Sequence, residues 1–338
     1  TRSYHKLAEF IPIRVIMSGT PYANKPKDIW SQIYFLDFGL SLGSNYYDFE
    51  EDFTFPRESY LKKTFANNLK KLNEKISDFT VRETKDTAGI SLPNKEYINL
   101  YADFSPQQER IYNEALQHMS LQLIQDGKLV NEDLEWVLLR MIRLVQITSN
   151  PQLVNEDYNE ISGKMHLLKE TTESILEEDQ ANKIIVWTSY IKNTSLIQQS
   201  LQSYESCIVH GQQSEDENNR SIARFMDDEN VRIFIATPQK AGEGLTLTVA
   251  NHAIFYDRTF SLQHYLQAQD RIHRISQTRN CYVYNFFIKN SIDEYIEKLV
   301  QAKNITARLA IGDIDEETFL QESKFDLRRT LNEILAGF

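Results

Sequence analysis

The chain has 338 residues, of which 41% are hydrophobic and 25% charged, and its formal net charge is -11. This length allows two domains, each with a core of its own. No apolar run approaches the roughly 20 residues that a transmembrane helix needs, and the first ten residues lack the apolar stretch and cleavage site of a secretory signal. The acidic balance argues against general affinity for nucleic acid, but it allows a local basic groove.

Two cysteines, Cys207 and Cys281, lie far apart in apolar segments and form neither a metal-ligand pattern nor a disulfide framework. This usage favours a reducing compartment, so we expect an intracellular protein of the cytoplasm or nucleus that is not secreted. Neither His210 nor His252 has a partner at metal-ligand spacing, and we expect both to be structural. The sequence therefore predicts no metal site.

The first part of the chain combines one short apolar run with helical patterns. Val15 to Met17 predict a buried strand that ends at the turn Ser18-Gly19-Thr20-Pro21. Residues 28–38 carry apolar side chains at helical spacing. Residues 46–87 are rich in Phe, Lys and Asn and predict irregular helix.

The next part begins with residues 90–104, which predict an extended connector followed by a strand. Ser105-Pro106 is a helix start signal, with Ser at the N-cap and Pro in the first turn. Helical periodicity then continues, with breaks, to about Ile147. The pair Asn150-Pro151 stops it.

After Gly163 the pattern changes to short apolar runs that alternate with amphipathic stretches. The runs of strand length are KIIVWTS (183–189), SCIVH (206–210), VRIFIAT (231–237), HAIFYD (252–257) and CYVYNFFI (281–288). Helical patterns lie near 190–203, 214–227, 261–275 and 291–303. Runs with little alternation are typical of a sheet covered on both faces, and strand–helix alternation makes that sheet parallel. The sequence therefore predicts an α/β fold with a doubly wound sheet, followed by a charged helical tail.

Ligands of such sheets gather at the loops that follow the carboxyl ends of strands. Gly242 and Gly244 occupy one such loop and would let backbone N–H groups approach phosphate oxygens. A GxG pair alone is more typical of an ordinary turn. Lys164 follows Ser162-Gly163, but the full phosphate-loop pattern GxxxxGK[ST] is absent from the sequence, so Lys164 is expected to open a helix.

The stretch QAQDRIHRISQ (267–277) concentrates cations in an acidic chain. If residues 261–275 are helical, Gln267, Arg271 and Arg274 share one face. Two guanidinium groups on one face can hold a polyphosphate. Spacing alone favours the simpler interpretation, a surface helix whose arginines pair with Asp270 or nearby carboxylates.

Taken in order, these segments resemble the C-terminal part of a Snf2-family (SWI2/SNF2) helicase-like ATPase, from the family's motif III to its motif VI. The matching segments, in chain order, are VIMSGTPYANKPKDIWSQIYFL, VRETKDT with SLPNKEYINLYADFSPQQERIYNEAL, ITSNPQLV with SGKMHLL, KIIVWTSY, IVHG with Arg220, ATPQKAGEGLTLTVANHAIFYD and QAQDRIHRISQ. One such match is weak, whereas seven in family order are strong.

The chain departs from the family pattern at several positions. Ser18 stands where the family usually has Thr, Ala241 and Ser276 where it has Gly, and Thr246 where Asn is common. FSLQHYLQ replaces the usual W-N-P stretch before motif VI. None of these changes removes a charged participant.

The resemblance implies four regions: the end of a RecA-like lobe 1 (1–45), helical protrusions with the interlobe linker (46–160), a RecA-like lobe 2 (161–305) and the tail (306–338). The family's phosphate loop and acidic D-E-x-H box have no counterpart in these residues. We therefore expect the chain to be a fragment that is inactive as an ATPase by itself.

The resemblance also implies roles for individual residues. Arg271 and Arg274 would be catalytic arginine fingers supported by Gln267, and Gly242, Gly244 and Asp257 would serve nucleotide binding. Ser189, Gly211 and Thr237 would contact DNA phosphates. ATP and Mg²⁺ would be bound mainly by the rest of lobe 1, and the partners would be double-stranded DNA and that rest of lobe 1, with no membrane.

Two interpretations from other classes compete with this one. A degenerate helicase lobe could serve as a non-catalytic scaffold or regulatory module, although the retained Gln267, Arg271 and Arg274 argue against it. An unrelated doubly wound enzyme, such as a nucleotide-sugar transferase, would explain the sheet and the glycine loop. It would not explain SGTP or the arrangement of residues 267–277.

Overall fold

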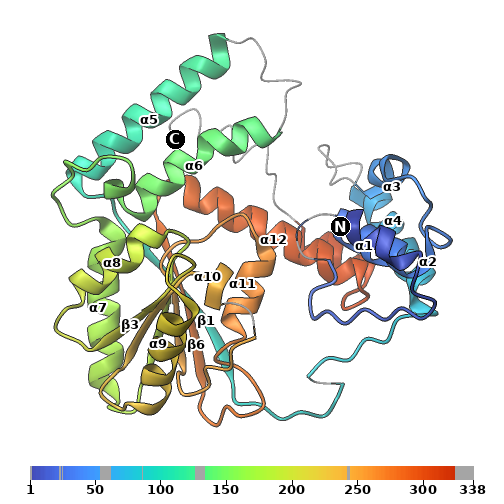
Figure 1. The fold of residues 1–338 in the computed structure, drawn as a ribbon. Helices are drawn as coiled ribbons and strands as arrows, with labels where there is room; N and C mark the ends of the chain where they lie inside the picture. The colour runs from blue at the N-terminus through green and yellow to red at the C-terminus, as the bar shows by residue number, and fades with distance from the viewer. Residues whose placement is uncertain are drawn as a thin grey trace. The chain divides into compact units, whose positions relative to one another are not determined.

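The structure, a computed structural model, describes residues 2–22, 24, 26–53, 62–85, 87–125, 134–241 and 244–323. The chain divides into two compact units (Figure 1). The first unit comprises residues 1–88, 260–263 and 298–328, and the second comprises residues 89–259, 264–297 and 329–338. Each unit buries apolar side chains of its own.

The described part of the first unit is helical. Its helices are α1 (Arg2–Ala8), α2 (Pro26–Asp37), α3 (Tyr46–Phe53), α4 (Lys62–Ser77) and α13 (Glu316–Glu322). In α4, Phe65, Leu69, Leu72 and Ile76 recur at helical spacing and are buried. The predictions of helix at 28–38 and within 46–87 are confirmed. Residues 54–61, and residues 324–338 of the expected helical tail, lie outside the described residues.

The strand predicted at Val15–Met17 is wrong. These residues belong to no strand, and Ile13, Val15 and Met17 are 83%, 77% and 93% exposed. An apolar run forms a strand only where a neighbouring strand pairs with its backbone N–H and C=O groups. The first unit has no strand in the part of the chain that the structure describes, so this run stays exposed.

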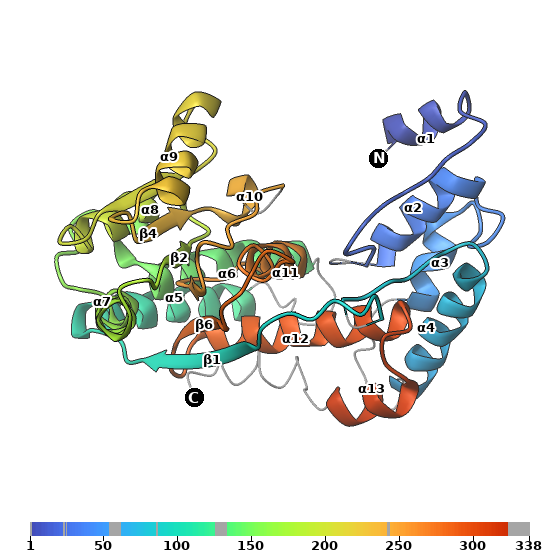
Figure 2. The same cartoon turned by 90° about the horizontal axis from the view of Figure 1, so that it is seen from below.

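The second unit contains a six-stranded sheet in the order β1-β6-β5-β2-β4-β3, with every neighbouring pair parallel. The strands are β1 (Lys95–Ala102), β2 (Ile184–Trp187), β3 (Ser206–Val209), β4 (Ile233–Ala236), β5 (His252–Phe255) and β6 (Cys281–Ile288). This confirms the α/β prediction and all six strands that the sequence suggested after residue 89. What the sequence did not predict is that β1 joins the same sheet at its edge, beside β6 (Figure 2).

Helices cover both faces of this sheet, as the unbroken apolar runs predicted. On one face lie α7 (Gly163–Glu178) and α8 (Ile191–Ser200), and on the other lie α9 (Glu215–Asp227) and α11 (Leu262–Gln269). The remaining helices are α5 (Pro106–Gln125), α6 (Leu134–Ser149), the 3₁₀ helix η2 (Pro151–Leu153), α10 (Pro238–Ala241) and α12 (Ile292–Ala310), of which α12 contributes residues to both units. Ile184 of β2 packs in a core with α7 and α8, and its neighbour Ile185 packs in a second core with Phe225 of α9 and Ala268 of α11. Because successive strand residues point to opposite faces, the sheet is doubly wound.

Several helix boundaries follow the local signals. The Ser105 hydroxyl accepts from the backbone N–H of Gln108 (3.4 Å), and α5 begins at Pro106 as predicted. The stop predicted at Asn150-Pro151 is also confirmed, because α6 ends at Ser149 and the Asn150 side chain then caps η2.

The helix predicted over 261–275 is too long, because α11 ends at Gln269. The N–H of Arg271 donates to the carbonyl of Ala268, three residues back, at 3.2 Å. The carbonyl of Arg271 accepts from Leu247 N, in a different loop, at 3.0 Å. A tertiary hydrogen bond thus replaces the helical one. Gln267, Arg271 and Arg274 therefore do not share one helical face.

His252 has the structural role that its position predicted. It is buried at the start of β5 and stacks on the ring of Tyr282, with centroids 5.0 Å apart. Burial, and secondarily the charge of Arg279, lowers the pKa of His252 from 6.5 to about 4. The imidazole is therefore neutral at pH 7.

Candidate functional site

The first candidate site is the arginine turn, residues 270–274, which follows α11. Arg271 is 5% exposed. Its Nε donates to the carbonyl of Gln267 (3.0 Å), and its Nη1 donates to the carbonyl of Leu245 (2.8 Å). Arg271 therefore ties the turn to the loop 244–250, which we call the glycine loop.

Arg274 lies at the other end of the turn and is half-buried. Its Nη1 donates to the hydroxyl of Thr246 at 2.8 Å. The hydroxyl of Ser276 lies 2.7 Å from that of Thr248. Thr246 and Ser276 are two of the positions where the chain departs from the family pattern. Both now carry side-chain hydrogen bonds between the glycine loop and the residues in and just after the arginine turn.

Gly244 opens the described part of the glycine loop. Its φ is +73°, and a Cβ added to it would meet no atom within 4 Å. Its backbone conformation, rather than crowding, therefore favours glycine. Gly242, the other glycine expected to serve nucleotide binding, lies outside the described residues.

Gln277 is a site residue that the sequence reasoning missed. It is 5% exposed, and its Nε2 donates to the carbonyls of Thr248 (3.2 Å), Ala250 (2.9 Å) and Ile272 (2.8 Å). Its Oε1 accepts from the backbone N–H groups of the next two residues, each at 2.9 Å. Gln277 thus fixes the turn against the glycine loop. Its position at the end of QAQDRIHRISQ was the only signal.

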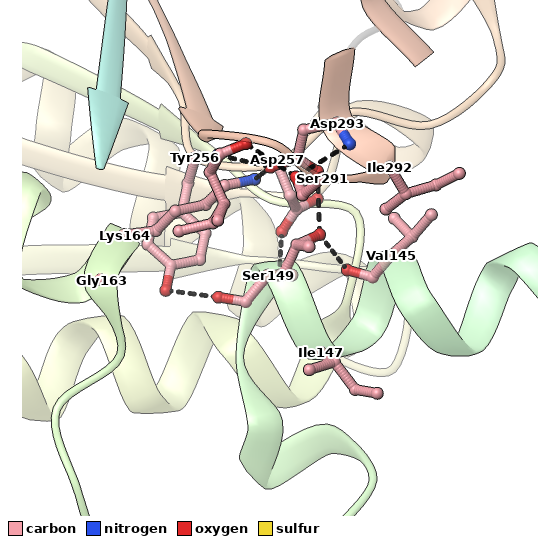
Figure 3. A network of polar contacts seen from close by, with 12 residues as sticks. Val145, Ile147, Ser149, Gly163, Lys164, Tyr256, Asp257, Ser291, Ile292 and Asp293 are labelled. Atoms are coloured by element: carbon pink, nitrogen blue, oxygen red, sulfur yellow. Dashed lines mark hydrogen bonds and ion pairs between the residues drawn. The ribbon is translucent and has the colours of Figure 1, made fainter. Parts of the chain in front are cut away.

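The second candidate site is a buried cluster, the Asp257 network, formed by Ser149, Thr188, Asn193 and Asp257 (Figure 3 shows Ser149 and Asp257). Asp257 is 3% exposed. Its Oδ2 accepts from the hydroxyls of Thr188 (2.7 Å) and Ser149 (2.8 Å) and from Asn193 Nδ2 (3.3 Å). Its Oδ1 accepts from the backbone N–H of Ser189 at 2.7 Å.

These contacts show what the buried carboxylate of Asp257 does within the fold. Asp257 joins the carboxyl ends of β2 and β5 to the end of α6. Its expected part in nucleotide binding stays a prediction.

A buried ion pair extends this polar region (Figure 3). Lys164 Nζ lies 2.6 Å from Asp293 Oδ2, and both side chains are buried. Asp293 also accepts from the hydroxyl of Thr148 at 2.8 Å. The hydroxyl of Tyr256 donates to the carbonyl of Ser149 at 2.8 Å. Lys164 does lie in the first turn of α7, as expected, and its charge is neutralised inside the protein.

The three residues expected to contact DNA differ in their exposure to solvent and in the hydrogen bonding of their backbone N–H groups. Ser189 is half-buried, and its N–H is committed to Asp257. Thr237 is 4% exposed, and its N–H donates to the carbonyl of Val209 at 3.2 Å. Gly211 is exposed, with no atom within 4 Å of an added Cβ. The N–H groups of Ser189 and Thr237 are thus already bonded within the protein. Contact of the three residues with DNA phosphates stays a prediction.

The arginine turn and glycine loop suit a polyanion, because guanidinium N–H groups match phosphate oxygens and Gly244 leaves the start of the loop without a side chain. Throughout the described residues, no group of three or more His, Cys, Asp or Glu could hold a metal ion. Among the same residues, no helix is both long and apolar enough to cross a membrane.

Two family models match the chain. The SNF2-related domain matches residues 7–153, and the helicase conserved C-terminal domain matches residues 163–276. The second range contains the glycine loop, the arginine turn and Asp257.

Among curated proteins, the ATP-dependent DNA helicase DDM1 of Arabidopsis thaliana is 26% identical over 88% of this chain and 42% of its own length. The putative ATP-dependent helicase/translocase YwqA of Bacillus subtilis is 27% identical over 86% of this chain and 31% of its own length. The chain thus spans less than half of these relatives. Among solved structures, the Sulfolobus solfataricus SWI2/SNF2 ATPase core in complex with dsDNA is 27% identical, with a TM-score of 0.54, over 95% of this chain and 65% of that one.

Proposed function

This chain belongs to the Snf2 family, and on that premise we propose that it is part of an ATP-dependent translocase that moves along double-stranded DNA. The observation that carries the proposal is the arginine turn, in which Arg271 and Arg274 both donate to the glycine loop. Relatives named as ATP-dependent helicases, and a similar core solved with dsDNA, support the choice of ATP and of DNA.

In this proposal the two arginines have unequal tasks. Arg274, half-buried, is the finger that reaches the γ-phosphate of ATP, where such an arginine contributes roughly 10³- to 10⁵-fold to the rate. Arg271, more deeply buried, shapes the glycine loop and adds positive charge beside it. Gln267 supports Arg271 through its carbonyl. Gly244 and Gly242 let the loop backbone approach the nucleotide.

ATP supplies the phosphoryl group whose transfer to water drives the motor. We propose that ATP and Mg²⁺ are held mainly by a phosphate loop and an acidic box of lobe 1, since neither pattern occurs in these 338 residues. By itself the chain would then bind nucleotide poorly and hydrolyse no ATP. Further lobe 1 residues would also cover the exposed run Ile13–Met17.

On the DNA side, the proposal rests on Gly211 and on the hydroxyl of Ser189. Gly211 is exposed and without a side chain, so a phosphate can approach its backbone. Thr237 is retained as a weaker candidate because only 4% of it is exposed. Contacts of this kind position a duplex without reading its sequence.

The test is the DNA-stimulated ATP turnover of Arg271→Ala and Arg274→Ala in the full-length protein, with DNA affinity measured in parallel. We expect turnover to fall at least about 10³-fold in both while DNA binding survives. Near-normal turnover in both variants would overturn the arginine-finger assignment and favour a scaffold or regulatory role.

A further inference from the structure

The arginine turn has little regular backbone structure of its own, because α11 ends at Gln269 and β6 begins only at Cys281. Contacts from outside must therefore set its shape. The glycine loop supplies one set of contacts, through the side chains of Arg271 and Arg274. A second set comes from residues 93–95, which we call the pre-strand segment because they lead into β1 and include its first residue.

Each residue of the pre-strand segment bonds to the arginine turn or to its continuation. His273 Nε2 lies 2.8 Å from the carbonyl oxygen of Pro93 and, with that partner, acts as the donor. Asn94 accepts from the N–H of Cys281 at 2.8 Å. Lys95 Nζ lies 2.8 Å from Asp270 Oδ1. All of these residues belong to the second compact unit.

In the arginine turn, each residue whose side chain bonds to the pre-strand segment stands directly before an arginine. Asp270 precedes Arg271, and His273 precedes Arg274. The residues that hold the pre-strand segment therefore alternate with those that hold the glycine loop. Restraining Asp270 and His273 restrains the backbone that carries both guanidinium groups.

We propose that Lys95, Asp270 and His273 are positioning residues, which hold the arginine turn so that Arg271 meets the glycine loop and Arg274 meets the nucleotide in one fixed geometry. This inference rests on the proposed function. Catalysis by a positioned group is sensitive to small displacements, because a misplacement of about 1 Å can cost roughly 10²-fold in rate.

The fold itself does not depend on these contacts. β1 is already fixed by eight residues paired with β6 along its whole length. The side chains of Lys95 and Asp270 are 13% and 44% exposed, so water can solvate the carboxylate that a substitution leaves behind. Such a pair contributes little to stability.

The chain offers a matched control pair. Lys289 and Asp103 form an ion pair of 3.0 Å at the opposite end of the same two strands, and this pair is the more exposed of the two. Lys95→Met and Lys289→Met thus remove the same type of contact from the two ends of one strand pair. In the full-length protein, we expect Lys95→Met to lower kcat about 10-fold, with KM for ATP and DNA affinity unchanged.

Lys289→Met should stay within about twofold of the parent protein in all three measurements. Two rescue variants separate positioning from folding. The exchange Lys95→Asp with Asp270→Lys should restore most of the lost kcat. His273→Gln, which keeps an N–H donor for Pro93, should retain more activity than His273→Phe.

The results distinguish failure of the proposed function from failure of the positioning role. If Arg271→Ala and Arg274→Ala both have near-normal turnover, the proposed function fails. If Arg274→Ala is inactive but Lys95→Met matches Lys289→Met, only the positioning role is overturned. If Lys95→Met lowers kcat and the charge exchange does not restore it, the ion pair is not the cause and the inference is likewise overturned.

Discussion

Asp257 is 3% exposed and Arg271 is 5% exposed, yet the two buried charges have different surroundings. The two carboxylate oxygens of Asp257 accept hydrogen bonds from residues of α6 and α8 and from the two residues that follow β2. Arg271 instead donates to the carbonyls of Gln267, in α11, and of Leu245, in a loop that contains an exposed glycine. Arg274, three residues on, is half-buried. The Asp257 network therefore joins elements of the fold, and the arginine turn places charge beside a loop with an exposed glycine. Burial alone does not distinguish these two kinds of surroundings.

The largest effect on stability is expected at the Asp257 network. Asp257→Ala leaves Thr188, Ser149 and the N–H of Ser189 without their buried acceptor. We expect a loss of about 3 to 5 kcal/mol in the free energy of unfolding, the range for removing one member of a buried charged network. Urea unfolding of the chain measures it.

Asp103→Ala is the control for this prediction, because the side chain of Asp103 is 78% exposed in its ion pair with Lys289. Its effect should stay below about 1 kcal/mol. Equal losses in the two variants would show that the Asp257 network does not hold the fold, and the contrast with the arginine turn would then disappear.

A smaller effect is expected where α7 begins beside the same network. A Cβ on Gly163 would lie 1.9 Å from the carbonyl oxygen of Asp103. Gly163→Ala should therefore force the backbone apart and destabilise the chain by about 1 to 3 kcal/mol. Gly211→Ala is the matched control, because an added Cβ there meets no atom within 4 Å. Thermal unfolding of the two variants would contradict this account if the chain with Gly211→Ala were the less stable one.

Predictions of strands from the sequence were correct where the local apolar pattern was matched by a neighbouring strand, and wrong where it was not. The apolar runs around Ile184 and Ile233 became fully buried strands, as the pattern indicated. The run from Ile13 to Met17 has a similar pattern, but it lacks a partner strand among the described residues of its unit and is exposed. An apolar pattern predicts the capacity to form a strand, and a neighbour decides whether the strand forms.

At the candidate site, too, contacts between segments distant in the sequence could not be predicted from local patterns. Spacing alone favoured a surface helix for QAQDRIHRISQ, and only the family resemblance implied a nucleotide role for Arg271 and Arg274. The structure shows that both arginines donate to the glycine loop. The end of α11 at Gln269 could not be foreseen, because no Gly or Pro marks it and a hydrogen bond from Leu247, distant in sequence, replaces the helical one. The contacts of Lys95 and Gln277 likewise depend on segments that are far apart in the chain.

The most direct test of the arginine turn is single-turnover ATP hydrolysis by Arg274→Lys in the full-length protein at saturating ATP and DNA. Lysine keeps the positive charge but loses the planar fork that matches phosphate oxygens. We predict that the hydrolysis rate falls at least about 10²-fold while the affinities for ATP and DNA change little. A hydrolysis rate near that of the parent protein would contradict the central claim, because it would mean that Arg274 does not act on the transferred phosphoryl group through its guanidinium.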